Sequence, residues 1–135
     1  MKTGLPVAFV VSDTEFVELS EIEGFEDGSG FVAIIRVGSG EFSCSGRRFY
    51  FDDLPRFLRD LKKSYSEVRG YAELRQRYEE EFIRFEFTSR GHVLITGLLK
   101  QYSPLKLSLQ FGFEADQSFV PPFIASIQAA LSDIK

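Results

Sequence analysis

Residues 105–114 read Leu-Lys-Leu-Ser-Leu-Gln-Phe-Gly-Phe-Glu, so that large apolar residues occupy every second position. A period of two is the period of a β-strand, in which successive side chains point to opposite faces. We therefore expect one strand here, with its buried face made by Leu105, Leu107, Leu109, Phe111 and Phe113. The alternation stops at Asp116-Gln117-Ser118-Phe119, where Asp116 can cap a turn into a last helix.

Weaker versions of this alternation come directly before it, in residues 82–87 and 92–99. Strands of this kind build antiparallel sheets with one dry and one wet face. Turn residues separate the strands, at Ser89-Arg90-Gly91 and at Ser103-Pro104. Further strands are expected in the first part of the chain, at residues 7–11, 14–20, 31–37 and 41–51. Residues 21–30, with three glycines and four acids, are expected to form a loop.

Two segments have the apolar spacing of helices. Asp53 can cap the first, Pro55 fits its first turn, and Gly70 is expected to end it. Residues 71–79 are compatible with helix or strand, and a second helix is expected over 121–134. We predict a single α+β domain over residues 1–135. In it, two helices, one after the fourth strand and one C-terminal, cover the dry face of one curved antiparallel sheet of about six to seven strands.

The composition places the chain among soluble globular proteins, with 44% apolar and 27% charged residues. The 15 Phe and 5 Tyr residues, with no Trp, favour a β-rich aromatic core. A single cysteine, Cys44, cannot form an internal disulfide, which favours a reducing compartment. No stretch approaches the roughly 20 apolar residues of a membrane span. We expect a cytoplasmic protein that does not bind membranes.

Residue types that carry catalysis are few. His92 is the only histidine, so no two-histidine metal site or histidine relay can form, and an ordinary turn or strand role is expected for it. Cys44 lies between two serines in an expected strand and is interpreted as a small buried residue. Glu79, Glu80 and Glu81 are adjacent, but only alternate residues of a strand share a face. The sequence therefore predicts no catalytic residues, no cofactor and no metal site.

Charge is distributed unevenly along the chain, whose net charge is −4. Residues 1–46 have a net charge of −6, residues 47–77 of +4 and residues 78–135 of −2. The basic residues of the first helix (Arg56, Arg59, Lys62 and Lys63) could follow a nucleic-acid backbone, but acidic residues interrupt them and the pI is about 5.1. We interpret this helix face as solvated and expect no nucleic-acid partner.

The acidic segment Glu18–Asp27, most of which lies in the expected loop, is the best candidate for a binding surface. It contains no Lys or Arg, and its candidate contact residues are Glu21, Glu23, Phe25, Glu26 and Asp27. Acidic groups around an aromatic anchor favour fast, salt-sensitive association with a basic protein. A solvated acidic loop without a partner is the alternative.

An ordered set of landmarks resembles the WapI-like immunity protein family from about residue 16 to the last helix. The landmarks are Val17-Glu18-Leu19, Gly24-Phe25, Gly70, Ala72, Leu74, Tyr78-Glu79, Gly91-His92-Val93, Gly97 and Asp116-Gln117-Ser118-Phe119. We interpret the motif residues Gly91, His92, Gly97, Asp116, Gln117 and Phe119 as structural. Pro121-Pro122 and the segment 38–60 depart from the pattern of the family.

The resemblance implies a small cytoplasmic antidote to a polymorphic bacterial toxin, which in such systems is often a nuclease. Such a protein binds its cognate toxin and occludes the active surface without catalysis. Two other functions stay open at this point. One is a small-ligand-binding or weakly catalytic domain with a pocket between sheet and helices, in which His92 could take part. The other is a subunit of a larger assembly, which would expose an apolar patch.

Overall fold

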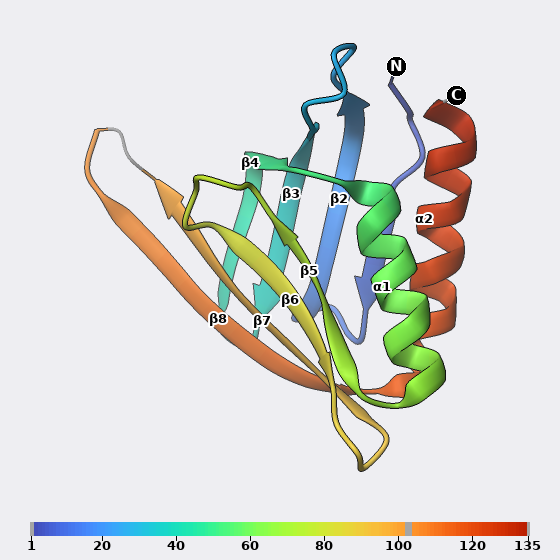
Figure 1. Cartoon of the computed structure of the whole chain (residues 1–135). Coiled ribbons are helices and arrows are strands. Elements are labelled where there is room, and N and C mark those ends of the chain that lie inside the picture. The colour runs from blue at the N-terminus through green and yellow to red at the C-terminus, as the bar shows by residue number, and fades with distance from the viewer. Residues whose placement is uncertain (1, 102–103, 135) are drawn as a thin grey trace.

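The strands form two separate antiparallel sheets of four strands each (Figure 1). The computed structural model describes residues 2–101 and 104–134. Within each sheet the strands lie in chain order, β1-β2-β3-β4 and β5-β6-β7-β8. The α+β class and the positions of the two helices are confirmed, whereas the prediction of one curved sheet is wrong.

The first sheet contains β1 (Val7–Val10), β2 (Glu15–Gly24), β3 (Phe31–Ser39) and β4 (Phe42–Phe51). The second contains β5 (Gly70–Arg75), β6 (Phe82–Phe87), β7 (His92–Gln101) and β8 (Leu107–Asp116). Helix α1 (Leu54–Glu67) joins the two sheets, and a short 3₁₀ turn, η1 (Gln117–Phe119), leads into helix α2 (Val120–Ile134).

The two sheets arise because α1 interrupts the series of hairpins. Each strand pairs with its neighbour in the chain, and after β4 the chain leaves the first sheet to form the helix. Hydrogen bonds still connect the two sheets. The Asp52 N–H donates to the Arg75 carbonyl at 3.1 Å, and the Ser39 hydroxyl donates to the Gly112 carbonyl at 2.9 Å. Alternation in the sequence predicts which face of a strand is buried, but not which strands share a sheet.

Helix α1 begins as the sequence predicts. The Asp53 side chain accepts the Arg56 N–H at 2.8 Å, and Pro55 lies in the first turn. The helix ends at Glu67, and Val68 takes the left-handed conformation, with φ 56°. Gly70 therefore does not end the helix but already begins β5, which resolves the ambiguity of residues 71–79 in favour of a strand up to Arg75.

Aromatic rings fill the core between the sheets and the helices. Phe9 of β1, Phe57 of α1, Phe85 of β6 and Phe123 of α2 are all fully buried. The ring centre of Phe85 lies 4.9 Å from that of Phe123, 5.4 Å from that of Phe9 and 5.7 Å from that of Phe57. Four elements that are distant in sequence thus share one cluster. Helix α1 packs on β5 and β6, and α2 packs on β1, β2 and α1.

The buried face of β8 is shorter than the alternation predicts. Phe111 and Phe113 are buried and Leu109 is half-buried, but Leu107 is 59% and Leu105 71% exposed. The prediction that all five share a dry face is therefore wrong for Leu105 and Leu107. Figure 1 shows the reason: the start of β8 projects beyond the first sheet and lies far from both helices.

Gly97 allows β7 and β8 to approach closely. A Cβ atom at this position would lie 2.3 Å from the Phe111 ring and 2.9 Å from the Phe82 carbonyl oxygen. Gly97→Ala should therefore lower the free energy of unfolding by about 1–3 kcal/mol, although alanine is normally the better residue inside a strand. Urea denaturation measures this change. Gly4→Ala, at a site with no atom within 4 Å, is the control, and equal stability of the two variants would contradict the prediction.

Candidate functional site

Strand β2 extends through the first four residues of the predicted acidic loop. The strand ends at Gly24, and only residues 25–30 form the connection to β3. A bulge between Ser20 and Glu23, with φ 48° at Glu21, shifts the register of β2 against β3. The shift fully buries Ile22 and leaves Glu21 and Glu23 exposed on either side of it. The prediction of a loop over residues 21–30 is thus wrong for its first four residues.

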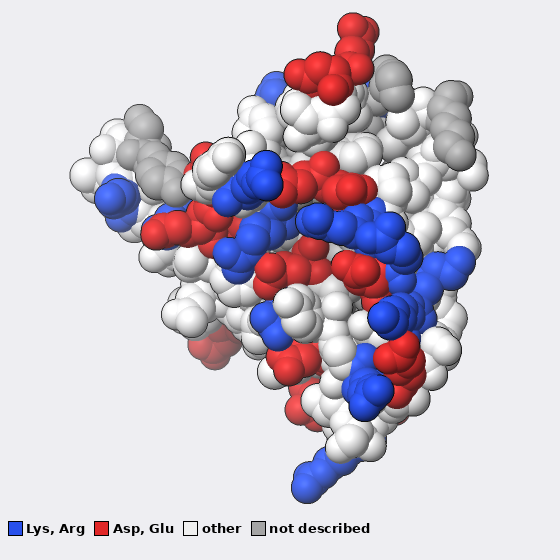
Figure 2. Space-filling view, in the orientation of Figure 1, with Lys and Arg blue, Asp and Glu red and all other residues white. Residues whose placement is uncertain are grey.

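The remaining connection is a small ordered loop with two carboxylates at its tip. The Phe25 N–H donates to the Gly30 carbonyl at 2.9 Å, and the Ser29 N–H donates to Asp27 Oδ1 at 2.9 Å. Hydrogen bonds from the Ser29 side chain and backbone lower the pKa of Asp27 below its usual value, which keeps this carboxylate ionised. We call Glu26 and Asp27 the acidic tip; the loop lies at the top of Figure 1, and its red atoms stand out in Figure 2.

Phe25 has an aromatic partner that the sequence did not reveal. Its ring stacks on that of Tyr50 in β4, with centres 6.4 Å apart and planes inclined by 24°, and both rings are partly exposed. Twenty-five residues separate the two positions. They meet because Tyr50 pairs with Val32 at the start of β3, directly below the loop. Only knowledge of this register could have predicted the pair.

The base of the acidic segment is less acidic than the sequence indicates. Lys2 forms a β-bridge with Glu23, and Lys2 and Arg48 line a depression of about 130 Å³ together with Glu21 and Glu23. The sequence did not predict these two cations at this place, because each lies more than 15 residues from the segment. Within residues 2–101 and 104–134, no Lys or Arg nitrogen lies within 4.0 Å of a carboxylate of the acidic tip. The two carboxylates of the tip therefore have no ion-pair partner among the described residues.

The six family-motif residues lie in the second sheet and at the start of α2. Gly91, with φ 82°, forms the β6–β7 turn, and its carbonyl accepts the Gln117 N–H at 3.1 Å. The Gln117 side chain donates to the His92 carbonyl at 3.2 Å, Asp116 accepts the Ser118 N–H at 2.7 Å, and the Phe119 ring lies 6.4 Å from that of Phe9. These contacts tie the turn to the helix start. A structural role for these residues stays a prediction, and the contacts support it.

The carboxylates of the Glu79–Glu81 run do not converge. The Glu81 side chain pairs with Arg47 of β4 and accepts the Lys100 N–H at 2.8 Å, while Glu80 pairs with the Lys100 ammonium group. Glu81 is buried and joins the two sheets. Its partners, Arg47 and Lys100, belong to different sheets, so we interpret Glu81 as a structural residue.

The two remaining reactive residue types are represented by Cys44 and His92. Burial raises the pKa of the Cys44 thiol above its usual value, so the thiol form predominates at neutral pH. Nδ1 of His92 lies 2.9 Å from Oε1 of Glu114 on the exposed face of the second sheet. In the part of the chain that the structure describes, no group of three His, Cys, Asp or Glu residues could hold a metal ion. In the interior, the aromatic core fills the space between the sheets and the helices.

An apolar patch lies at the opposite end of β4 from the acidic tip. Phe42, at the start of β4, is 68% exposed and borders the exposed Leu107 of β8. Between them is a depression of about 320 Å³, lined also by Cys44, Leu99 and Leu109. Exposed apolar patches are typical of protein–protein interfaces. We call Phe42 and Leu107 the apolar patch.

Of three comparisons with known proteins, one found a match. No curated protein and no solved structure matched the chain. None of the helices within the described residues is long and apolar enough to cross a membrane. A family model, described as the immunity protein WapI-like family, matches residues 5–135. Since the match covers nearly the whole sequence, the chain belongs to the WapI-like family of immunity proteins.

Proposed function

We propose that the protein is a non-enzymatic cytoplasmic immunity protein, which binds one cognate bacterial toxin and covers its active surface. Family membership carries this proposal, because immunity proteins of this kind are named for protection against a toxin. The chemistry of the described residues supports binding rather than catalysis. Cys44 has a raised pKa, and Glu81 is engaged by groups of the chain itself.

The acidic tip, together with Glu21, Glu23 and Phe25, is the proposed contact surface for the toxin. Glu26 and Asp27 carry uncompensated charge at the end of an ordered loop, and the Phe25–Tyr50 pair offers partly exposed aromatic area beside them. Charged groups accelerate the encounter with a basic partner, and a buried aromatic contact slows dissociation. The two features together therefore suit a tight and fast inhibitor.

Toxins that act on nucleic acids have a basic surface, because they must hold phosphate groups. Carboxylates on a preformed loop can occupy the same positions as phosphates and exclude the substrate. We therefore propose a basic toxin domain as the partner and steric occlusion as the mechanism. Nothing in this mechanism requires a cofactor or a bond to be made or broken.

Co-expression tests this function directly. The toxin domain encoded beside this gene, expressed alone in a bacterial host, should arrest growth, and co-expression of the protein should restore it. An unrelated acidic protein of similar size, expressed to the same level, is the control. Continued growth arrest in the presence of the folded protein would contradict the proposal.

The apolar patch supports a second candidate function, which is a subunit of a larger assembly. On this account the wild-type protein should self-associate in sedimentation experiments, and the Phe42→Ser plus Leu107→Ser variant should be monomeric. Both side chains are exposed, so the substitutions should leave the free energy of unfolding within about 0.5 kcal/mol per site. A wild-type protein that sediments as a monomer across the micromolar range would exclude self-assembly through this patch.

A further inference from the structure

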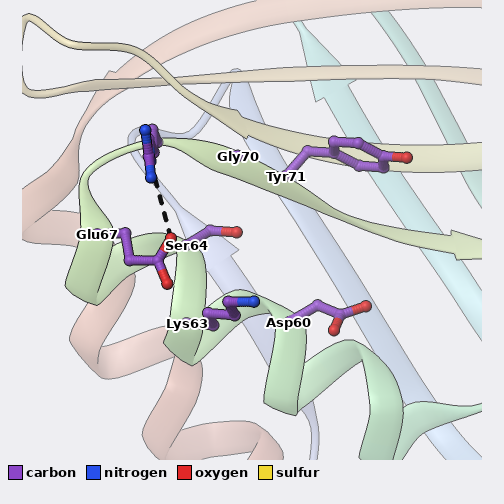
Figure 3. Close-up of a pocket in the computed structure, with 7 residues that line it drawn as sticks. Asp60, Lys63, Ser64, Glu67, Gly70 and Tyr71 are labelled. Carbon is purple, nitrogen blue, oxygen red and sulfur yellow. Dashed lines mark ion pairs between the residues drawn. The ribbon is translucent and has the colours of Figure 1, made fainter.

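A continuous groove runs between α1 and β5, on the face shown in Figure 2. Three depressions of about 430, 290 and 610 Å³ follow one another along it. Asp60 and Tyr71 border both the first and the second, and Asp52 and Arg56 border both the second and the third. Figure 3 shows its first part, where Lys63 and Glu67 of α1 lie across from Tyr71 of β5. We call this feature the α1–β5 groove.

The groove is lined by five cations and four carboxylates, but the carboxylates already have partners. Glu73 Oε1 lies 2.8 Å from Arg75 Nε, and Glu67 Oε1 lies 3.8 Å from Arg69 Nε. The remaining two carboxylates belong to Asp60, which lies 3.9 Å from Arg59 Nε, and Asp52, which accepts the Arg77 N–H at 3.2 Å.

Three cations of the groove have no such partner. Among residues 2–101 and 104–134, no carboxylate oxygen lies within 4.0 Å of the charged side-chain nitrogens of Arg56, Lys63 or Arg77. Arg56 and Arg77 border the same depression, and Tyr78 beside them is 89% exposed. Asp52 accepts only a backbone N–H and keeps its charge, so the three cations leave an excess of positive charge in the groove. An exposed aromatic ring accompanies it.

The groove adjoins the acidic tip. Ser29, whose N–H holds the Asp27 carboxylate, borders the same depression as Arg56 and Arg77. A negative and a positive surface thus share an edge. A partner that covers this edge must present basic groups to one side and acidic groups to the other, and such an arrangement fixes the register of an interface and rejects wrong partners.

We propose that the α1–β5 groove binds an acidic segment of the cognate toxin, next to the basic surface that meets the acidic tip. This inference rests on the proposed function and adds a second, oppositely charged contact to it. The ligand groups are carboxylates, which reach Arg56 and Arg77 at one end and Lys63 at the other. Nucleic acid, with its continuous row of phosphates, fits the groove less well than a short acidic segment, because Asp60 and Glu73 line the depression between Lys63 and Arg77.

Two triple variants of equal charge test this proposal. Arg56→Gln, Lys63→Gln and Arg77→Gln neutralise the groove, while Lys62→Gln, Arg90→Gln and Lys106→Gln neutralise three exposed cations outside it. Each set lowers the net charge by three, so general attraction to a basic toxin should rise equally in both. The measurement is the Kd for the inactivated toxin domain encoded beside this gene, by surface plasmon resonance, with thermal unfolding as a check that both variants fold.

We expect the Kd of the groove variant to rise at least tenfold and that of the control variant to stay equal or fall. A groove variant that binds as tightly as the control would overturn the inference and leave the proposed function intact. Failure of the wild-type protein to bind would instead overturn the proposed function, and the inference with it. Two other occupants would also overturn the inference. A second copy would give wild-type dimers that the groove variant loses in sedimentation, and nucleic acid would bind as a labelled 12-nucleotide strand to the wild type alone.

Discussion

Phe85→Ala should lower the free energy of unfolding by about 3–5 kcal/mol, the largest stability effect that we expect from a single substitution in this chain. The Phe85 side chain is fully buried and its ring contacts those of Phe9, Phe57 and Phe123, so truncation removes contacts to three elements at once. The surrounding rings belong to a strand and two helices, which cannot collapse into the cavity without moving. The total free energy of unfolding of a native domain is about 5–15 kcal/mol, so the variant should lose a large part of its stability.

Urea denaturation followed by circular dichroism measures this change, and Phe42→Ala provides a matched control. The same atoms are removed there from an exposed position, so the free energy of unfolding should change by less than about 0.5 kcal/mol. If the two variants were equally stable, the aromatic cluster would not be the centre of the core.

The second large effect concerns association with the toxin. Glu23→Lys combined with Glu26→Lys should slow association at least tenfold at low ionic strength, because both charges face solvent in the proposed contact surface. The difference in association rate between the wild type and this variant should shrink as salt is added, since screening weakens interactions between exposed charges. Stopped-flow or surface plasmon resonance measurements at several salt concentrations give the rate constants.

A second double variant with the same change in net charge separates this local effect from the effect of net charge alone. Glu15→Lys combined with Glu41→Lys alters the net charge by the same amount at the opposite end of the first sheet. We expect a much smaller change in the association rate for this pair. Equal association rate constants for the two double variants would show that the acidic segment is not part of the interface.

The sequence predicts most individual strands and both helices, because each depends on local spacing. The alternation over residues 105–114 identifies β8, and Asp53 marks the start of α1. The division into two sheets could not be predicted, because it depends on which strand edges meet. The alternation does not predict that Leu105 and Leu107 are exposed either. Their exposure depends on how far the β7–β8 hairpin projects beyond the first sheet.

The candidate surface was only partly predictable for a similar reason. The acidic residues are contiguous in sequence, but the cations Lys2 and Arg48 beside them come from other parts of the chain. A single bulge in β2 decides that Glu21 and Glu23 point to solvent while Ile22 is buried. The α1–β5 groove cannot be predicted from the sequence, because the pattern of residues 71–79 is compatible with helix or strand. Arg56 and Arg77 border the same depression only because residues 70–75 form strand β5.

Stoichiometric inhibition is the most direct test of the central claim, which is that this protein neutralises a toxin by covering its active surface. The purified toxin domain encoded beside the gene is titrated with the protein while its toxic activity is measured. We predict complete loss of activity at a fixed, low stoichiometric ratio, together with a stable complex in size-exclusion chromatography. A toxin that stays fully active in excess folded protein, with no complex formed, would contradict the account.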